Sequence, residues 1–412
     1  MRSFHFSSLL LAAASIVSAT PFADHEVSKR GMTIAPKVFI IDMFEPEGAA
    51  WWGIDEFDVL AQNITLPGLS PLFPEVHCTA DGDICQIITG ESEINAASSI
   101  SALVLSDKFD LTKTYFFVAG IAGVNPEVAT TGSVTFARYA VQVALQYEFD
   151  IRDLPDNFTT GYIPFSTDNP ADYPGDIYGT EVFELNLALR NVAMAFASTA
   201  ALNDTADAAA YRAKYASEAI YAAAAKPPSV VGCDVATSDV YYSGTLLSEA
   251  FENTTRIWTN GSGVYCSTAQ EDNATLEAIL RAAKANMTDY SRVIVMRTSS
   301  DFDRPPPGIS EIQNLLYVDQ GGFSPAIENI YLAGIKVVMG ILEGWDSTFA
   351  AGIVPNNYVG DIFDTLGGTP DYGLPSYFIS KRDVEARAPQ GNLRMRRAQH
   401  SAERRAAIMN EV

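Results

Sequence analysis

Short apolar runs of strand length alternate with longer helical stretches along most of this chain. The strand candidates are residues 38–41, 85–89, 114–119, 293–296 and 329–331. The helix candidates are residues 94–106, 181–199, 206–225 and 275–285. Alternation of this kind favours a layered α/β fold. We expect the alanine-rich section from about 180 to 226 to be a helical pair inserted between sheet elements.

The first thirty residues have the pattern of processing signals. Arg2 precedes an apolar core at 9–17, and small residues at 17–19 form a cleavage site. Lys29 and Arg30 make a dibasic processing site. We therefore predict a signal peptide over 1–19, a propeptide over 20–30, and a secreted, extracellular protein, with association to the cell wall left open.

We predict no membrane insertion of the mature chain. The apolar core of the leader is far shorter than the roughly 20 apolar residues that span a bilayer. Residues 331–345 are apolar in character, but Lys336 and Glu343 interrupt them.

The charge of the chain is large and unevenly spread. There are 50 acidic residues against 27 basic ones, yet residues 381–412 hold eight basic residues and four acids. We predict that 381–412 is a disordered or processed tail and that 31–380 is a single domain. An acidic body of this kind repels nucleic acid and anionic membranes, so we expect neither as a partner.

Four cysteines in a secreted chain predict two disulfides. Cys78 and Cys85 bracket a turn signal, so we pair them and leave Cys233 with Cys266. Three connectivities are open, and this one depends on proximity alone.

Seven Asn-x-Ser/Thr sequons are candidate glycosylation sites, of which we expect about half to be used. They are Asn63, Asn157, Asn203, Asn253, Asn260, Asn273 and Asn286.

Two predicted strands end in charged residues. The run 293–296 leads to Arg297 and Asp301, and the run 38–41 leads to acids that include Glu47. In open α/β sheets, ligands bind beyond the carboxyl ends of the strands, so these two ends indicate one shared cleft.

Histidine is scarce, which narrows the chemistry. His77 is the one histidine between the leader and the tail. A Ser-His-Asp or Cys-His site is then unfavoured, as is a histidine-rich zinc site. We predict no metal and no cofactor, so that any catalysis depends on carboxylates, arginine and tyrosine.

Six segments occur in the order found in the nucleoside phosphorylase and nucleosidase superfamily. They are residues 37–47, 87–98, 117–126, 238–244, 270–272 and 297–301. Over residues 36–378 the chain resembles the fungal purine nucleoside permease family within that superfamily. The resemblance implies a three-layer, nucleoside-phosphorylase-like fold, with a central mixed sheet flanked by helices and a purine nucleoside bound across the strand ends.

The resemblance also implies roles for three catalytic candidates. Asp301 matches the aspartate that faces N7 of the purine. Glu47 matches the acid that activates water in methylthioadenosine nucleosidases, and Arg297 matches an arginine near that water.

Five further residues are substrate-binding candidates by the same resemblance. Glu271 matches the glutamate that takes the ribose hydroxyls, and Asp272 competes with it for that role. Tyr241 falls where an aromatic residue stacks on the base. Gly120 permits close approach of a ligand, and Asn95 lies in a matched loop.

Two departures from the family pattern matter. Ile121 occupies a position that is often serine in the nucleosidases. The loop 90–95 offers Glu91 and Glu93 and no arginine, and carboxylates there would repel the phosphate that a phosphorylase must bind.

The chemistry of these residues fits cleavage of a purine N-glycosidic bond. That reaction passes through an oxocarbenium-like sugar and needs an acid for the departing base and a carboxylate for water and charge. Asp301 and Glu47 fill these roles. Free aspartate titrates near pH 4, so we expect an acidic optimum if Asp301 is the proton donor.

Each candidate also has a structural explanation. Asp301 fits a capping aspartate after a strand, and Glu47 fits a first-turn acid placed for the helix dipole. Arg297 fits a counter-ion for its acidic neighbours. Only one of Tyr241 and Tyr242 points into the cleft if both lie on a strand, and we favour Tyr241.

We predict from all this a secreted, metal-independent purine nucleosidase, an N-glycosyl hydrolase that releases base and ribose for salvage. One alternative is a phosphate-dependent purine nucleoside phosphorylase. Another is a nucleoside-binding component of purine nucleoside transport, without turnover. A homo-oligomer is also left open.

Overall fold

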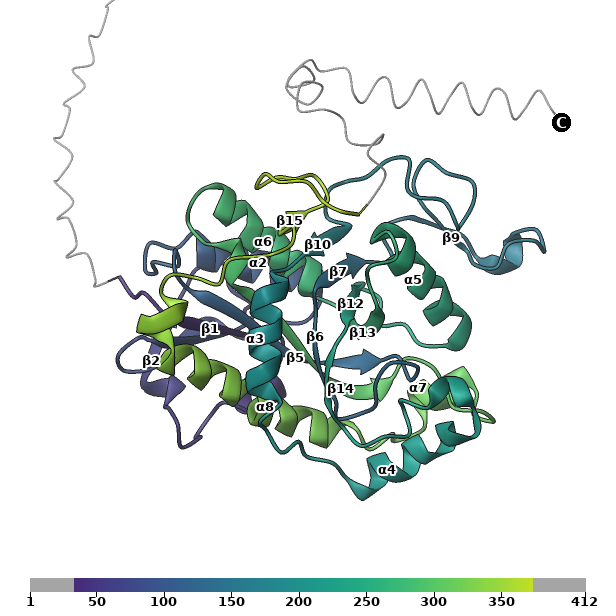
Figure 1. Cartoon of the computed structure of the whole chain (residues 1–412), viewed down its shortest axis with the longest axis horizontal. Helices are drawn as coiled ribbons and strands as arrows, with labels where there is room; N and C mark the ends of the chain where they lie inside the picture. Colours follow the sequence, from purple (N-terminus) through teal and green to yellow (C-terminus); the bar gives the residue numbers. More distant parts are fainter. Residues whose placement is uncertain (1–32, 373–412) are drawn as a thin grey trace, which may run out of the picture.

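The computed structural model describes residues 33–372 (Figure 1). The predicted signal peptide, the predicted propeptide and the tail 381–412 lie outside the described residues, so those boundaries stay predictions.

In the described part of the chain, thirteen strands form one mixed sheet. Ten of them follow the order β15-β10-β7-β12-β13-β5-β1-β4-β3-β2, while β14 pairs with β5 and β6, and β6 pairs with β11. The strands are β1 (Val38–Asp42), β2 (Gln62–Thr65), β3 (Glu75–Cys78), β4 (Ile84–Ile88), β5 (Tyr115–Val124), β6 (Val134–Phe136), β7 (Tyr139–Gln142), β10 (Val182–Glu184), β11 (Val230–Gly232), β12 (Asp234–Thr237), β13 (Tyr265–Ala269), β14 (Val293–Phe302) and β15 (Gly360–Asp361).

A second, two-stranded sheet pairs β8 (Tyr147–Glu148) with β9 (Tyr162–Ile163). The α-helices are α1 (Glu45–Ala49), α2 (Ser92–Val104), α3 (Leu187–Ala197), α4 (Ala206–Arg212), α5 (Thr245–Trp258), α6 (Asp272–Lys284), α7 (Glu311–Leu316) and α8 (Phe323–Glu343).

Strand β1 shows why the molecule has three layers. It is buried along its whole length and pairs in parallel with β4 and β5. Alternate side chains of a strand point to opposite faces, so Phe39 and Ile41 pack into the core that α2 and α6 cover. Val38 and Ile40 pack into the core that α3 and α8 cover (Figure 1). The predicted α/β fold with a central mixed sheet flanked by helices is confirmed.

Strand β14 carries the irregularity that matters most for the site. It runs parallel to β5, from Val293 opposite Phe116, and its register shifts between Ser299 and Asp301. A bulge of this kind inserts one extra residue, here Ser300, and redirects the side chains that follow.

Three of the predicted elements are wrong in type or length. Residues 329–331, predicted as a strand, lie inside α8, because a three-residue apolar run does not distinguish a strand from a buried helix. Residues 181–199 begin as β10, and α3 starts only after Asn186, whose side chain accepts hydrogen bonds from the next turn. In the segment 206–225, α4 ends at Arg212 and short 3₁₀ turns follow.

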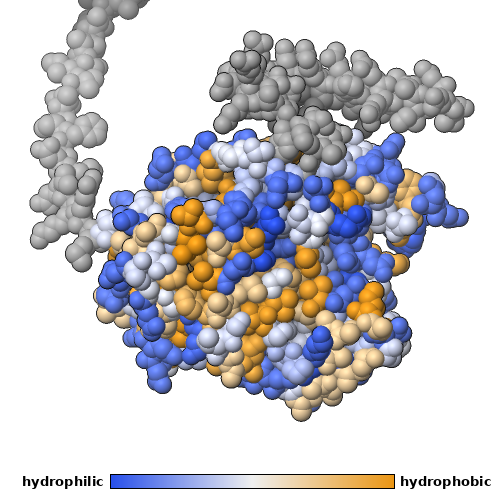
Figure 2. Space-filling model, in the orientation of Figure 1, coloured by the Kyte–Doolittle hydropathy of each residue, from blue (hydrophilic) through white to orange (hydrophobic). Residues whose placement is uncertain are grey.

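Helix α8 is long and apolar enough to cross a membrane by length and composition, alone among the helices of residues 33–372. More than half of its apolar window is buried within the fold, against β14 and β5. Figure 2 shows the face of the molecule seen in Figure 1, on which hydrophobic residues gather in patches across the middle. The predicted absence of membrane insertion and the homo-oligomer both stay predictions.

Both predicted disulfides are confirmed. Cys78–Cys85 joins paired residues of the neighbouring strands β3 and β4. Cys233–Cys266 joins the residue before β12 to β13.

The sequons differ in exposure. Asn63, Asn157, Asn260 and Asn286 are exposed, while Asn203 and Asn253 are half-buried. Asn273 is buried: it is 2% exposed in α6, and its side-chain amide donates a hydrogen bond to the carbonyl of Thr180 at 2.8 Å. That packing leaves no room for a glycan.

Candidate functional site

A cavity of about 420 Å³ opens at the ends of β1, β5, β13 and β14. The loop 238–244 after β12 and the segment from α7 to the start of α8 close its other sides. Of the predicted residues, those that line it are Glu47, Tyr241, Glu271, Arg297 and Asp301. Gly120, Asp272 and Asn95 do not line it.

Glu47 joins the ends of two strands. It lies in the short helix α1 and is 1% exposed. Its Oε2 accepts a hydrogen bond from the backbone N–H of Met43, and its Oε1 accepts one from that of Ile121, both at 2.7 Å. Burial raises the pKa of Glu47 to about 8, although the charge of Arg297 opposes this. The isoleucine in place of a serine at 121 therefore still contacts Glu47, through its backbone.

Gly120 lies behind the cavity wall, where it permits close packing. A Cβ atom at this position would lie 1.9 Å from Cε of Met43, 2.8 Å from Oε1 of Glu47 and 2.7 Å from Nη1 of Arg297. Gly120 does not line the cavity, and that it permits close approach of a ligand stays a prediction. Its lack of a side chain permits Glu47 and Arg297 to approach each other.

Arg297 is buried, and most of its hydrogen-bonding capacity is used by other residues of the protein. Its Nη2 lies 2.8 Å from Oδ2 of Asp272 and 3.0 Å from Oε2 of Glu271. Its Nη1 donates to the carbonyl of Ile121 at 3.0 Å. Burial lowers the pKa of Arg297, but the carboxylates of Asp272 and Glu271 outweigh this and raise it, so the guanidinium stays charged.

The two acids at the start of α6 have different positions. Glu271 is in the cavity wall, and its Oε1 accepts the backbone N–H of Ser92 at 3.0 Å. Burial raises the pKa of Glu271, while the charge of Arg297 lowers it. Asp272 is fully buried beneath Arg297 and does not reach the cavity. The geometry thus favours Glu271 over Asp272 as a ligand contact.

Asp301 follows the bulge of β14 and faces Tyr241 across the cavity wall. Its Oδ1 accepts the hydroxyl of Ser300 at 2.7 Å, and its Oδ2 accepts that of Tyr241 at 3.0 Å. Burial raises the pKa of Asp301, and both hydrogen bonds oppose the rise. The ring of Tyr241 is exposed at the mouth, whereas Tyr242 is buried behind it.

Asn95 stays outside the cavity. Its side chain is exposed, and its amide donates to the carbonyl of Glu91 at 2.7 Å. This contact links the first turn of α2 to the loop before it, and substrate binding by Asn95 stays a prediction. Glu91 from the same loop does line the cavity.

Several residues of the cavity wall were not predicted from the sequence. Ser300, Thr268 and Gln320 line the cavity, and the bulge at Ser300 falls in the polar run after the apolar residues 293–296, where the strand was not predicted to continue. Asp42 lies buried below Glu47, with Oδ2 accepting the amide of Gln86 at 2.7 Å, and burial raises its pKa to about 7. Within residues 33–372, no group of three or more His, Cys, Asp or Glu side chains is arranged to hold a metal ion.

Comparisons with known proteins give a consistent family. The family model described as "Purine nucleoside permease (NUP)" matches residues 35–354. A Candida albicans protein named purine nucleoside permease is 50% identical over 348 residues, which is 83% of this chain and 84% of that protein. A Schizosaccharomyces pombe protein named as a probable purine nucleoside permease is 40% identical, over 82% of this chain and 98% of that protein.

Solved structures give more distant matches. A 5'-methylthioadenosine/S-adenosylhomocysteine nucleosidase from Neisseria meningitidis has a TM-score of 0.42 and 13% identity, over 76% of this chain and 99% of that chain. A futalosine hydrolase from Helicobacter pylori has a TM-score of 0.41 and 13% identity, over 75% and 97%. Both likenesses are too distant to bear on activity.

Two predictions are corrected by the sequence relatives. The relatives are named permeases, so the prediction of an N-glycosyl hydrolase is wrong. A permease is a membrane transport protein, so the prediction of a secreted, extracellular protein is wrong as well.

Proposed function

This chain belongs to the purine nucleoside permease family, and from that membership we propose that it binds purine nucleosides during their transport and leaves them intact. The observation that carries the proposal is the cavity of about 420 Å³ whose wall carries two groups of polar side chains, one with Glu47 and Glu271 and one with Ser300 and Asp301. Its volume lies within the roughly 300–1,000 Å³ of small-molecule sites.

Each of these two groups of polar side chains suits one half of a nucleoside, the ribose or the base. Glu271 and Glu47 supply carboxyl oxygens that can form hydrogen bonds with ribose hydroxyls. Asp301 and Ser300 supply polar groups for the edge of a purine, and the ring of Tyr241 supplies an aromatic surface beside them.

The fixed geometry of Glu47 supports a role in binding. Both of its oxygens are held by backbone N–H groups, from Met43 and Ile121. A carboxyl group tethered in this way is a preorganised hydrogen-bonding group, which lowers the entropy that ligand binding must overcome.

Calorimetric titration followed by chromatography of the ligand tests the proposal. Purified protein is titrated with inosine, adenosine, guanosine and uridine, and each ligand is then recovered. We expect the purine nucleosides to bind at least about tenfold more tightly than uridine, a difference of about 1.4 kcal/mol, and to be recovered whole.

Two variants make the test specific to the cavity. Asp301→Asn is expected to weaken inosine binding, and Asp346→Asn, at an exposed position outside the cavity, is expected to leave it unchanged. Absence of binding to every nucleoside, or recovery of free base, would contradict the proposal.

A further inference from the structure

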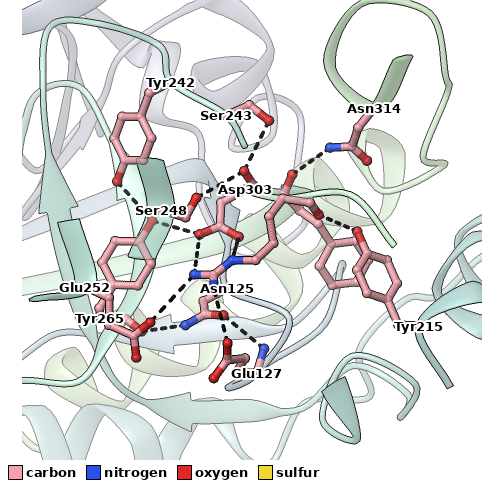
Figure 3. Close-up of polar contacts among 12 residues, drawn as sticks. Asn125, Glu127, Tyr215, Tyr242, Ser243, Ser248, Glu252, Tyr265, Asp303 and Asn314 are labelled. Atoms are coloured by element: carbon pink, nitrogen blue, oxygen red, sulfur yellow. Dashed lines mark hydrogen bonds and ion pairs between the residues drawn. The ribbon is translucent and has the colours of Figure 1, made fainter. Parts of the chain in front are cut away.

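A second cluster of buried charge lies directly behind the cavity wall (Figure 3). Its centre is the pair Asp303 and Arg304, which are 1% and 0% exposed. Nε of Arg304 lies 3.0 Å from Oδ1 of Asp303, and its Nη2 lies 3.2 Å from Oδ2. Neither residue lines the cavity.

Tyrosine hydroxyls and two further acids, Glu127 and Glu252, complete the cluster. Figure 3 shows Tyr265 directed at Asp303, with its hydroxyl donating to Oδ2 at 2.7 Å. The hydroxyl of Tyr242 lies 3.2 Å from that of Tyr265. On the other side, Nη1 of Arg304 lies 3.1 Å from Oε1 of Glu127.

A contribution to the stability of the fold does not by itself explain why these charges are buried. Removing charges from water is costly, and replacing a buried ion pair with apolar residues of similar volume is often neutral or stabilising. We therefore interpret a buried ion pair beside a binding site by the local geometry that it holds in place.

What the cluster fixes is the loop 238–244. The backbone carbonyl of Asp303 accepts the N–H of Gly244 at 2.8 Å, the hydroxyl of Ser243 at 3.1 Å and that of Ser248 at 3.3 Å. The same loop carries Val240, Tyr241 and Tyr242 into the cavity wall.

The loop is thus anchored twice to one segment of chain. Its Tyr241 hydroxyl bonds to the side chain of Asp301, and its far end bonds to the backbone of Asp303, two residues later. The side chain of Asp303 is held in turn by Arg304 and Tyr265.

We infer that Asp303, Arg304 and Tyr265 are positioning residues for the nucleoside site, which hold the wall formed by Val240, Tyr241 and Tyr242 against the ligand without touching it. This inference rests on the proposed function. It extends the site from the groups that contact the nucleoside to the buried pair that sets their position.

Tyr265→Phe is the variant that tests the inference with least disturbance, because it removes a single hydroxyl. Tyr290→Phe is the matched control: Tyr290 is buried, and its hydroxyl has no hydrogen-bond partner among the residues that the structure describes. We expect Tyr265→Phe to weaken inosine binding about tenfold, or about 1.4 kcal/mol, and Tyr290→Phe to change it less than twofold.

A double-mutant cycle separates positioning from general stability. Tyr241→Ala removes the wall contact, so adding Tyr265→Phe to it is expected to cost less than twofold in affinity. Thermal unfolding of each variant shows that the comparison is made on folded protein. Losses of affinity that simply add would overturn the inference.

The wild-type titration distinguishes this inference from the proposed function. A wild-type protein that binds inosine, together with Tyr265→Phe of equal affinity, would overturn the inference alone. A wild-type protein that binds no purine nucleoside would overturn the proposed function and the inference with it.

Discussion

Four buried carboxyl groups lie near a single guanidinium, that of Arg297, either in the cavity wall or beneath it. Glu271 and Asp272 pair directly with Arg297, while Asp42 and Glu47 lie beyond them. Burial raises the pKa of Asp42 to about 7 and that of Glu47 to about 8. Because removal from water disfavours the charged form, both carboxyl groups stay largely protonated below about these pH values.

This raised pKa predicts how stability depends on pH. Between about pH 4.5 and 8 the carboxyl group of Glu47 binds more protons in the folded protein than in the unfolded chain, so its contribution to the free energy of unfolding falls as pH rises. Glu47→Gln removes a titrating group and is expected to reduce the slope by up to about 1.4 kcal/mol per pH unit between pH 5 and 7. Urea unfolding at a series of pH values measures the slope.

A matched variant controls for the charge change itself. Glu343→Gln, at an exposed position of α8, is expected to leave the slope unchanged. An equal slope in wild type and Glu47→Gln would mean that Glu47 is ionised throughout this range in the folded protein.

The sequence was sufficient to predict most of the charged residues that lie at the cavity. It was not sufficient to predict which of them face the cavity and which are buried beneath it. Glu47, Arg297 and Asp301 follow apolar runs, and strand ends are where a sheet exposes such groups. Glu271 and Asp272 are neighbours at a helix start, and only the packing of Arg297 determines which of them faces the cavity. That packing depends on contacts between distant segments, which local patterns do not encode.

At the scale of elements, the parallel centre of the sheet was predictable and its periphery was not. Strands β1 and β4 and the first four residues of β14 are buried and mostly apolar, which makes them visible as continuous runs. Short strands such as β10, with three residues, carry too few positions to show a period. The buried residues of α8 recur at helical spacing along its 21 residues, a pattern that the three-residue run 329–331 is too short to show.

The two disulfides connect elements at different separations, and this predicts unequal contributions to stability. Cys233–Cys266 closes a loop of 33 residues and Cys78–Cys85 one of 7. Loop-closure entropy then gives about 3.7 kcal/mol for the longer loop and about 2.3 kcal/mol for the shorter. We expect paired Cys→Ser replacement of Cys233 and Cys266 to lower the free energy of unfolding by the larger amount, measured by urea unfolding.

The shorter disulfide is the internal control for the longer one. Both pairs of variants lose two sulfur atoms from buried positions, so packing losses are similar and loop length is the main difference. An equal or larger loss for the pair Cys78 and Cys85 would contradict the entropic account.

At the scale of the whole molecule, acidic charge is the dominant property, and it extends into the cavity. The chain has a formal net charge of −23. Among the described residues that line the cavity, the basic side chain is Arg297 alone, and its guanidinium is already paired. The acidic residues in the wall are Glu47, Glu91, Glu271, Asp301 and Asp319, of which Glu47 is largely protonated at neutral pH.

This charge distribution predicts discrimination between nucleosides and their phosphate esters. A phosphate group would enter a wall of carboxylates with no unpaired cation to meet it, and like charges brought together cost several kcal/mol. We expect inosine 5'-monophosphate to bind at least about 100-fold more weakly than inosine, a difference of about 2.7 kcal/mol. The Debye length falls from about 10 Å at 0.1 M salt to about 3 Å at 1 M, so high salt should narrow the gap while leaving the affinity for neutral inosine within twofold. Titration of both ligands at the two salt concentrations measures this, and equal affinities at 0.1 M salt would show that Arg297 is free to accept a phosphate.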